Sequence, residues 1–263
     1  MTPEQTFSAL QRIARQEGRA VQEVLTLYVL ERFLARLVES LYEDSFVLDE
    51  KLCKQVVAEI AAAKADDGVV YDAVPTRIEQ IRDEEEYSAL RVHVKAQLYR
   101  AQITVKLDTS TGDPISPHAK LVTMPRILGG EFTLMGHPPE TVIPEKAESI
   151  LQRVATSTRR RDYIDVRSLS RSGSCSAGIL RKAIEEVAKH RQVELSAPSA
   201  SLTGHSEIAQ QKWAAWRKKT DVEDITRALR TDELTEVAAF LDPIFVDAVG
   251  QVAAWDPASK TWR

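Results

Sequence analysis

Apolar residues recur at helical spacing near both ends of the chain, whereas the middle alternates apolar and polar residues. Spacings of three and four residues predict N-terminal helices over 3–16, 21–41 and 52–63, and Gly18 ends the first of them. In the second half, the same spacing predicts helices over 145–156, 162–170, 176–190, 206–218, 222–229 and 232–249.

The middle of the chain carries the clearest strand pattern. Apolar residues at 90, 92, 94, 96 and 98 alternate with polar ones, and the alternation returns at 103, 105 and 107 after Tyr99-Arg100. This pattern predicts a β-hairpin in which Asp108 lies at a strand end and points away from the core. Shorter strands are expected over 46–48, 68–71 and 76–81. A Pro-rich loop is predicted from Gly112 to about Pro144.

These elements predict an α+β protein. N-terminal helices lead into a small mixed sheet, and a helical bundle follows it. A chain of 263 residues can hold two modest domains, which we place at 1–139 and 140–263. A cleft between the sheet and the bundle would then be the natural ligand site.

Composition and cysteine usage point to a globular protein of a reducing compartment. An apolar fraction of 43% with 28% charged residues argues against disorder. Cys53 and Cys175 are far apart, which argues against a disulfide framework or a zinc site. Because the chain has no signal-peptide core and no apolar run of membrane-spanning length, we expect a cytoplasmic protein that does not enter a membrane.

Charge is unevenly distributed along the chain. Between Arg153 and Arg191 ten Lys or Arg residues face four Asp or Glu residues, so this stretch carries +6 within a chain of net charge −4. Such a stretch could attract the phosphates of a nucleotide or of RNA, form a solvated helix face, or dock an acidic partner. The pattern alone leaves these three readings open.

Residues 140–171 combine several groups that handle phosphate or metal. Lys146 is expected near the start of one helix. Asp162 and Asp165 share a face of the next helix because they are three residues apart, and Arg161 lies one turn before Asp165. A lysine, arginines and paired carboxylates suit a site for phosphate and metal. The plainer alternative is that Asp162 caps its helix and Asp165 pairs with Arg161 on the surface.

Five segments of the chain stand in an order that matches a known family. They are LTLYVLERFLARLVES with FVL, DDGVVYDAVPTRIEQIRDEEEYSALRVHVKAQL, VKLDTSTGDPISP, ETVIPEKAESIL with RRRDYIDVRSL, and QKWAAWRKK. The order of these motifs resembles the AbiEii/AbiGii-type nucleotidyltransferase toxins of type IV toxin–antitoxin and abortive-infection systems. The resemblance covers most of the chain, and it implies a polymerase-beta-type nucleotidyltransferase fold.

The resemblance also implies a chemistry and its residues. Such a toxin transfers a nucleotide from an NTP to an RNA acceptor, tRNA in some members, with Mg²⁺, and it has a cognate antitoxin. The residues that match catalytic positions are Asp108, Lys146 and Asp165, with Asp108 as the metal ligand. Those expected to bind nucleotide or phosphate are Lys106, Arg161 and Asp162.

One part of the family pattern is absent, so the fold is expected in truncated form. Family members continue from the FVL strand into a Gly-Gly or Gly-Ser turn and then an Asp-x-Asp strand. Here 46–48 runs straight into DEKLCKQVVAEIAAA, and the chain contains no Asp-x-Asp. The site is therefore expected to be degenerate, although Asp49 or Glu50 could supply a replacement carboxylate.

The alternative function is a catalytically silent protein that binds RNA, a nucleotide or the antitoxin through Arg159–Arg161. A variant of it reads 9–37 as a DNA-binding helical module, although a plain helical hairpin explains this helix–Gly–helix pattern equally well.

Overall fold

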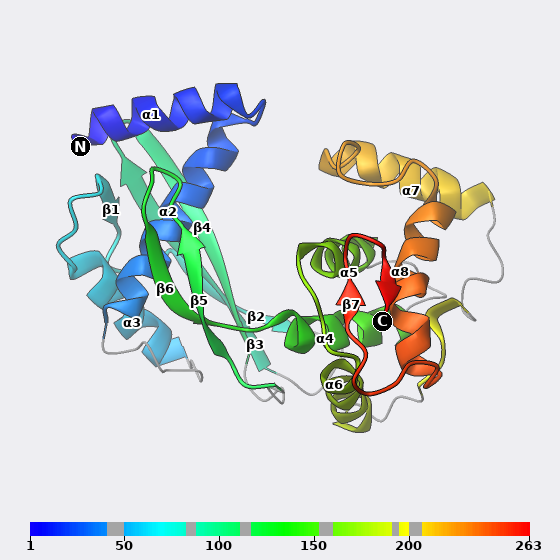
Figure 1. The fold of residues 1–263 in the computed structure, drawn as a ribbon. Helices are drawn as coiled ribbons and strands as arrows, with labels where there is room; N and C mark the ends of the chain where they lie inside the picture. Colours follow the sequence, from blue (N-terminus) through cyan, green and yellow to red (C-terminus); the bar gives the residue numbers. More distant parts are fainter. Residues whose placement is uncertain (41–49, 83–87, 111–116, 153–159, 191–194, 200–206) are drawn as a thin grey trace. The chain divides into compact units, whose positions relative to one another are not determined.

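The computed structural model describes residues 1–40, 50–82, 88–110, 117–152, 160–190, 195–199 and 207–263. They divide into two compact units (Figure 1). Unit 1 is Met1–Asp113 with Lys120–Gly136, and unit 2 is Pro114–Ala119 with His137–Arg263. The combination of helices and small sheets confirms the predicted α+β class. The expected domain boundary after residue 139 stays a prediction.

Unit 1 begins with the three helices that the sequence predicts, α1 (Pro3–Gln16), α2 (Val21–Val38) and α3 (Glu50–Ala62). The first starts at a capping box, because the Thr2 hydroxyl accepts the Gln5 N–H while the Gln5 side chain accepts the Thr2 N–H. The expected strand over 46–48 lies outside the described residues.

The sheet of unit 1 is built around its longest strand, β3 (Ser88–Leu98). The strand β4 (Ala101–Ser110) pairs along one edge, and β1 (Val69–Tyr71) and β2 (Arg77–Arg82) pair along the other. Every strand pair among the described residues is antiparallel. The β3–β4 hairpin confirms the predicted alternation, and its buried side chains pack with α1, α2 and α3 in one core.

The expected loop from Gly112 to about Pro144 is wrong in its middle, because this part forms a hairpin. The strands β5 (Lys120–Pro125) and β6 (Glu131–Gly136) pair antiparallel. Gly129 and Gly130 have φ of 93° and 84° in the connection, a backbone region that glycine adopts without strain. The strand β6 contacts α2, which also contacts β4.

The loop prediction is also wrong at its end, because α4 (Pro139–Gln152) begins before Pro144. Lys146 therefore lies beyond the first turn of this helix, not at its start. Pro144 removes one helical hydrogen bond, but Ile143 and Ala147 on either side of it are fully buried. Their packing outweighs the propensity that predicts a loop.

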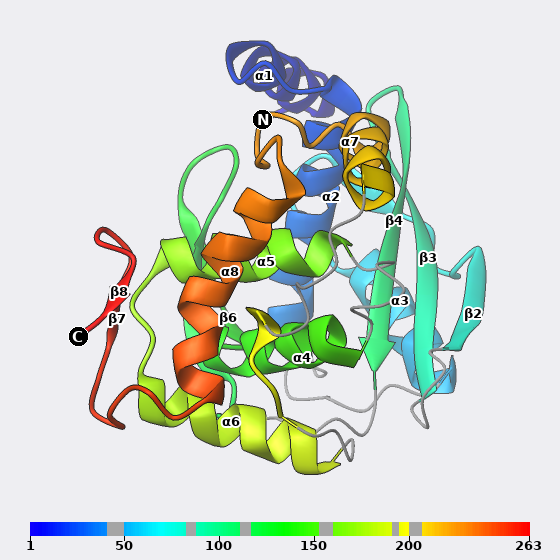
Figure 2. The same cartoon turned by 90° about the vertical axis from the view of Figure 1, so that its right-hand side faces the viewer.

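Unit 2 contains α5 (Arg160–Ser172), α6 (Ala177–His190), α7 (Glu207–Thr220) and α8 (Arg230–Phe245) besides α4. Their bounds confirm four of the predicted helices within a few residues. The helix α4 packs against α5 and α6, and α8 packs against α5, α6 and α7 (Figure 2). A second apolar core, with Leu180, Phe240 and Leu241 at its centre, holds these helices together.

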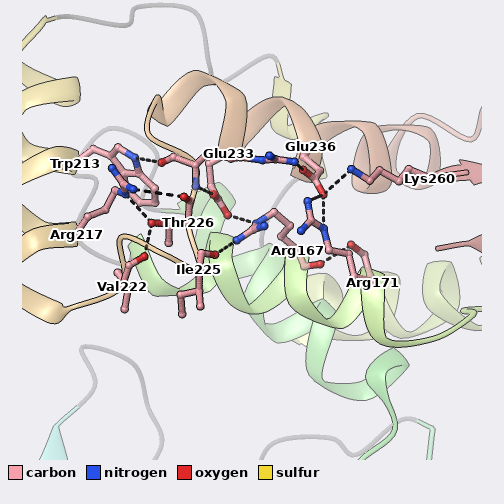
Figure 3. A network of polar contacts seen from close by, with 12 residues as sticks. Arg167, Arg171, Trp213, Arg217, Val222, Ile225, Thr226, Glu233, Glu236 and Lys260 are labelled. Carbon is pink, nitrogen blue, oxygen red and sulfur yellow. Dashed lines mark hydrogen bonds and ion pairs between the residues drawn. The ribbon is translucent and has the colours of Figure 1, made fainter. Parts of the chain in front are cut away.

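The predicted helix over 222–229 is wrong, since this segment forms turns. Side chains from neighbouring helices donate hydrogen bonds to its backbone carbonyls (Figure 3). The Trp213 indole donates to the Arg227 carbonyl at 3.0 Å, and the Arg217 guanidinium donates to the Glu223 carbonyl at 2.8 Å. These bonds replace the ladder that a helix would have made.

A short hairpin that the sequence does not predict ends the chain, β7 (Trp255–Asp256) with β8 (Thr261–Trp262). The Trp255 indole donates to the Ser170 carbonyl at 2.7 Å, and the Trp262 indole donates to the Phe240 carbonyl at 2.9 Å. The two tryptophans thereby attach the hairpin to α5 and α8.

Candidate active site

Three of the six predicted site residues meet between α4 and α5. The Lys146 Nζ lies 3.1 Å from the Asp162 Oδ1 and 3.0 Å from the Asp165 Oδ2. The meeting follows from packing, because Ala147 next to Lys146 and Val166 next to Asp165 are fully buried in the shared core. Both helices therefore present the charged residues at the rim of that core.

The three side chains of this ion-pair cluster differ in how far they are buried. Asp162 is only 4% exposed, whereas the side chains of Lys146 and Asp165 are 31% and 32% exposed. Burial lowers the pKa of Lys146, but hydrogen bonds and charges from Asp165 and Asp162 outweigh it, so the pKa lies above its ordinary value. Lys146 therefore carries a full positive charge at neutral pH.

One atom of the cluster has no hydrogen bond. The Asp162 Oδ2 is buried and finds no donor among the described residues. Asp162 also lies in the first turn of α5, where the helix dipole favours a negative charge. A buried carboxylate oxygen without a donor is costly, so this atom is a place where a ligand or a water molecule could donate.

Arg161 does not make the ion pair that the plainer surface reading requires. Asp165 pairs with Lys146, and Arg161 is exposed in the first turn of α5 without an ion-pair partner among the described residues. Arg159, part of the expected basic patch, lies outside them. The described part of this patch thus offers one exposed guanidinium beside the acidic pair.

Asp108 lies in unit 1, on the solvent face of β4, as its strand phase predicts. Arg91 on β3 holds both of its carboxylate oxygens, with Nε–Oδ1 and Nη2–Oδ2 distances of 2.7 Å each. The hydrogen bonds from Arg91 lower the pKa of the Asp108 carboxyl below its ordinary value. Lys106 is exposed two residues earlier on the same face.

A comparison with known protein families decides the relationship. A family model described as "Nucleotidyl transferase AbiEii toxin, Type IV TA system" matches residues 47–238. The match spans well over half of the chain and includes Asp108, Lys146, Asp162 and Asp165. The chain belongs to the AbiEii family. Neither the curated proteins nor the solved structures gave a match.

Membership confirms the resemblance read from the sequence. The protein is a nucleotidyltransferase-like toxin of the type IV toxin–antitoxin class, and a family of this class implies a cognate antitoxin. No described helix is long and apolar enough to cross a membrane.

AbiEii-type nucleotidyltransferases generally use an NTP and a divalent metal ion, and the described carboxylates do not fit such an ion. Mg²⁺ prefers several oxygen ligands, yet both oxygens of Asp108 bind Arg91. Asp162 and Asp165 already hold the Lys146 ammonium. In the described part of the chain, no group of three or more His, Cys, Asp or Glu side chains could hold a metal ion.

Sequence reasoning missed Arg91, although the hairpin could have revealed it. A two-residue turn at Tyr99-Arg100 places Leu98 opposite Ala101, and counting seven residues back along β3 and forward along β4 places Arg91 opposite Asp108. The same register places His93 opposite Lys106, and the His93 Nε2 lies 2.9 Å from the Glu79 Oε1. Register therefore predicts partners that a reading of single strands does not.

Proposed function

We propose that this AbiEii-family protein transfers a nucleotide from an NTP to an RNA acceptor of the tRNA type in the cytoplasm. The observation that carries the proposal is the position of the Lys146 ammonium between the carboxylates of Asp162 and Asp165. This arrangement keeps a positive charge fixed at the rim of the α4–α5 core. A fixed cation stabilises the negative charge that develops on transferring phosphate.

The residues have distinct roles in the proposed reaction. The acceptor hydroxyl attacks the α-phosphorus of the NTP, its proton passes to the partly exposed carboxylate of Asp165, and pyrophosphate leaves. Lys146 neutralises phosphate charge during this step. Asp162 is buried and holds Lys146 in place, while Arg161 contributes a further cation for phosphate.

Two residues of β4 in unit 1, Asp108 and Lys106, match family positions for catalysis and phosphate binding. In this proposal Lys106 binds phosphate and Asp108 acts in catalysis. The resemblance makes Asp108 the Mg²⁺ ligand, but its carboxylate does not fit a metal ion while Arg91 binds both oxygens, so Asp108 can act only after Arg91 releases it. The required release is consistent with a site that has lost part of its original machinery.

The second candidate function is a catalytically silent protein that binds RNA, a nucleotide or the antitoxin. Two observations favour it. The sequence has no Asp-x-Asp, and the Asp108 carboxylate is engaged by Arg91. In this reading the Asp108–Arg91 pair orients a guanidinium on the sheet surface, and Arg161 and Lys106 still bind phosphate.

A transfer assay distinguishes the two functions. The purified protein is incubated with each of the four α-labelled NTPs, Mg²⁺ and tRNA, and labelled RNA is counted after separation on a gel. The enzyme reading predicts label in RNA with the wild type and a loss of at least about 100-fold with Lys146→Gln, the size of a typical electrostatic contribution. Lys182→Gln, an exposed lysine of α6, is the matched control and should retain full activity. Absence of label with the wild type would leave only the silent reading.

A further inference from the structure

The helix α7 has one face fixed to the protein and one face that is open. On the fixed face Trp213 is 1% exposed and Arg217 is 8% exposed. Arg217 donates to the Thr226 hydroxyl at 2.6 Å and to the Glu223 carbonyl at 2.8 Å (Figure 3). Gln210 adds two bonds, donating to the Ala228 carbonyl and accepting the Arg230 N–H. These contacts determine which side of α7 faces outward.

The open face of α7 is cationic. Lys212, Lys218 and Lys219 are exposed, and the structure gives none of them an ion-pair partner among the described residues. No Asp or Glu occurs among the described side chains of the helix, which are those from Ile208 to Thr220. The three positive charges thus stand together in a chain whose net charge is −4.

The shape of this face suits close approach by an extended partner. Ala214 and Ala215 lie between Lys212 and Lys218 along the helix and are exposed, so the side chains at these two positions are short, and the exposed Gln211 adds a neutral side chain at the N-terminal end of the face. Lys212 and Lys219 are seven residues apart, which is two helical turns, or about 10 Å along the axis. The lysines therefore flank a low surface along one side of the helix.

The neighbouring carboxylates limit how far the cationic face extends. Asp221, Glu223 and Asp224 follow the helix, and all three are exposed. Asp224 lines a hollow of about 440 Å³ against α5 together with Arg167 and Arg171, and none of its lining residues comes from α7. The positive face is consequently bounded at the C-terminal end of the helix and does not continue into the following segment.

We propose that the open face of α7, formed by Lys212, Ala214, Ala215, Lys218 and Lys219, binds the phosphate backbone of RNA. A row of partner-free lysines is complementary to a polyanion, and small residues between them let the backbone approach the helix. The inference rests on the RNA partner of the proposed function, but it does not require catalysis. In this proposal α7 binds RNA through a surface that does not include the Lys146 cluster.

The test measures RNA binding apart from nucleotide transfer. A fluorescent uridine oligonucleotide of about 20 nucleotides is titrated with protein over a series of salt concentrations, and anisotropy gives the dissociation constant. The variant replaces Lys212, Lys218 and Lys219 by Gln. Three lost phosphate contacts should reduce the slope of log K against log salt by about 2, which corresponds to roughly 50-fold weaker binding at about 0.15 M salt.

The matched control carries the same charge change on another helix. It replaces Lys51, Lys54 and Lys64 by Gln, three exposed lysines on or just after α3, and it should bind as the wild type does. Circular dichroism of both variants should match the wild type, since none of the six side chains is buried.

Several outcomes would overturn the inference. Equal loss in the control would show that net charge alone matters, and unchanged binding by the α7 variant would remove α7 from the interface. Equal affinity for poly-L-glutamate of the same charge would overturn the assignment to RNA. If tRNA is labelled in the transfer assay while the α7 variant binds RNA normally, only this inference fails. If the wild type does not bind RNA at all, the proposed acceptor fails with it.

Discussion

Replacing Lys146 by Met removes the cation that two carboxylates share. Breaking a buried ion pair from one side costs about 3–5 kcal/mol, because a buried charge is left without its partner. Lys146 and Asp165 are each nearly one-third exposed, so water recovers part of this cost. We expect Lys146→Met to lower the free energy of unfolding of unit 2 by about 2 kcal/mol, with most of the loss arising at buried Asp162.

A double-mutant cycle isolates the pair. Asp162→Asn removes the buried charge and leaves Lys146 paired with Asp165. In the double variant the penalty of a lone buried carboxylate disappears, so the combined loss should be smaller than the sum of the single losses by about 1–2 kcal/mol. The exposed Lys182–Glu186 pair of α6 provides the control, and Lys182→Met should change stability by less than about 0.5 kcal/mol.

Urea unfolding followed by tryptophan fluorescence measures these energies. The signal reports on unit 2 alone, because all four tryptophans of the chain lie there: Trp213, Trp216, Trp255 and Trp262. The slope of the free energy against urea should stay constant across the variants, so that midpoints can be compared. Additivity of the two substitutions within about 0.3–0.5 kcal/mol would refute the argument that Lys146 and Asp162 form a coupled, buried pair.

Three further outcomes follow from the structure. The pKa of Lys146 is raised above its ordinary value, so its stabilisation is complete below the ordinary value and is lost as pH rises through the raised one. The stability gap between wild type and Lys146→Met should therefore be constant near neutral pH and shrink during an alkaline titration. Cys175 is buried, and burial raises its pKa to about 12. In a Cys53→Ser background, a thiol reagent should therefore label Cys175 only as fast as the protein unfolds, and rapid labelling would contradict the burial. A Cβ on Gly178 would lie 2.7 Å from the Gln251 carbonyl oxygen, so Gly178→Ala should lower the free energy of unfolding in urea by about 1–3 kcal/mol. Gly250 has open space around it, so Gly250→Ala should leave that free energy nearly unchanged.

The sequence predicted most helices and the central hairpin because these depend on local periodicity. The alternation across β3 and β4 determines which side chains are buried, and it correctly turned Asp108 outward. The spacing of Asp162 and Asp165 placed both on one face of a helix, and Lys146 meets that face. A period of two or 3.6 residues is sufficient for such statements.

Features that depend on tertiary contacts could not be predicted in this way. The helix α4 tolerates Pro144 because its neighbours are buried in the core of unit 2, which no local propensity records. The segment 222–229 has a helical pattern, yet its carbonyls are taken by Trp213, Arg217 and Arg167 from other helices. The pairing of Arg91 with Asp108 follows only from strand register, which depends on where the chain turns.

The proposed function depends most on the Lys146 ammonium, and initial rates of nucleotide transfer to tRNA test its role. The wild type, Lys146→Gln, Asp165→Asn and the double variant are assayed with an α-labelled NTP and Mg²⁺, because the Lys146 Nζ lies 3.0 Å from the Asp165 Oδ2. Residues that act as a unit are not additive, so each single substitution should remove most of the activity, and the double variant should be no slower than the slower single variant. Transfer that survives either substitution at the wild-type rate, or losses that multiply in the double variant, would contradict this joint role.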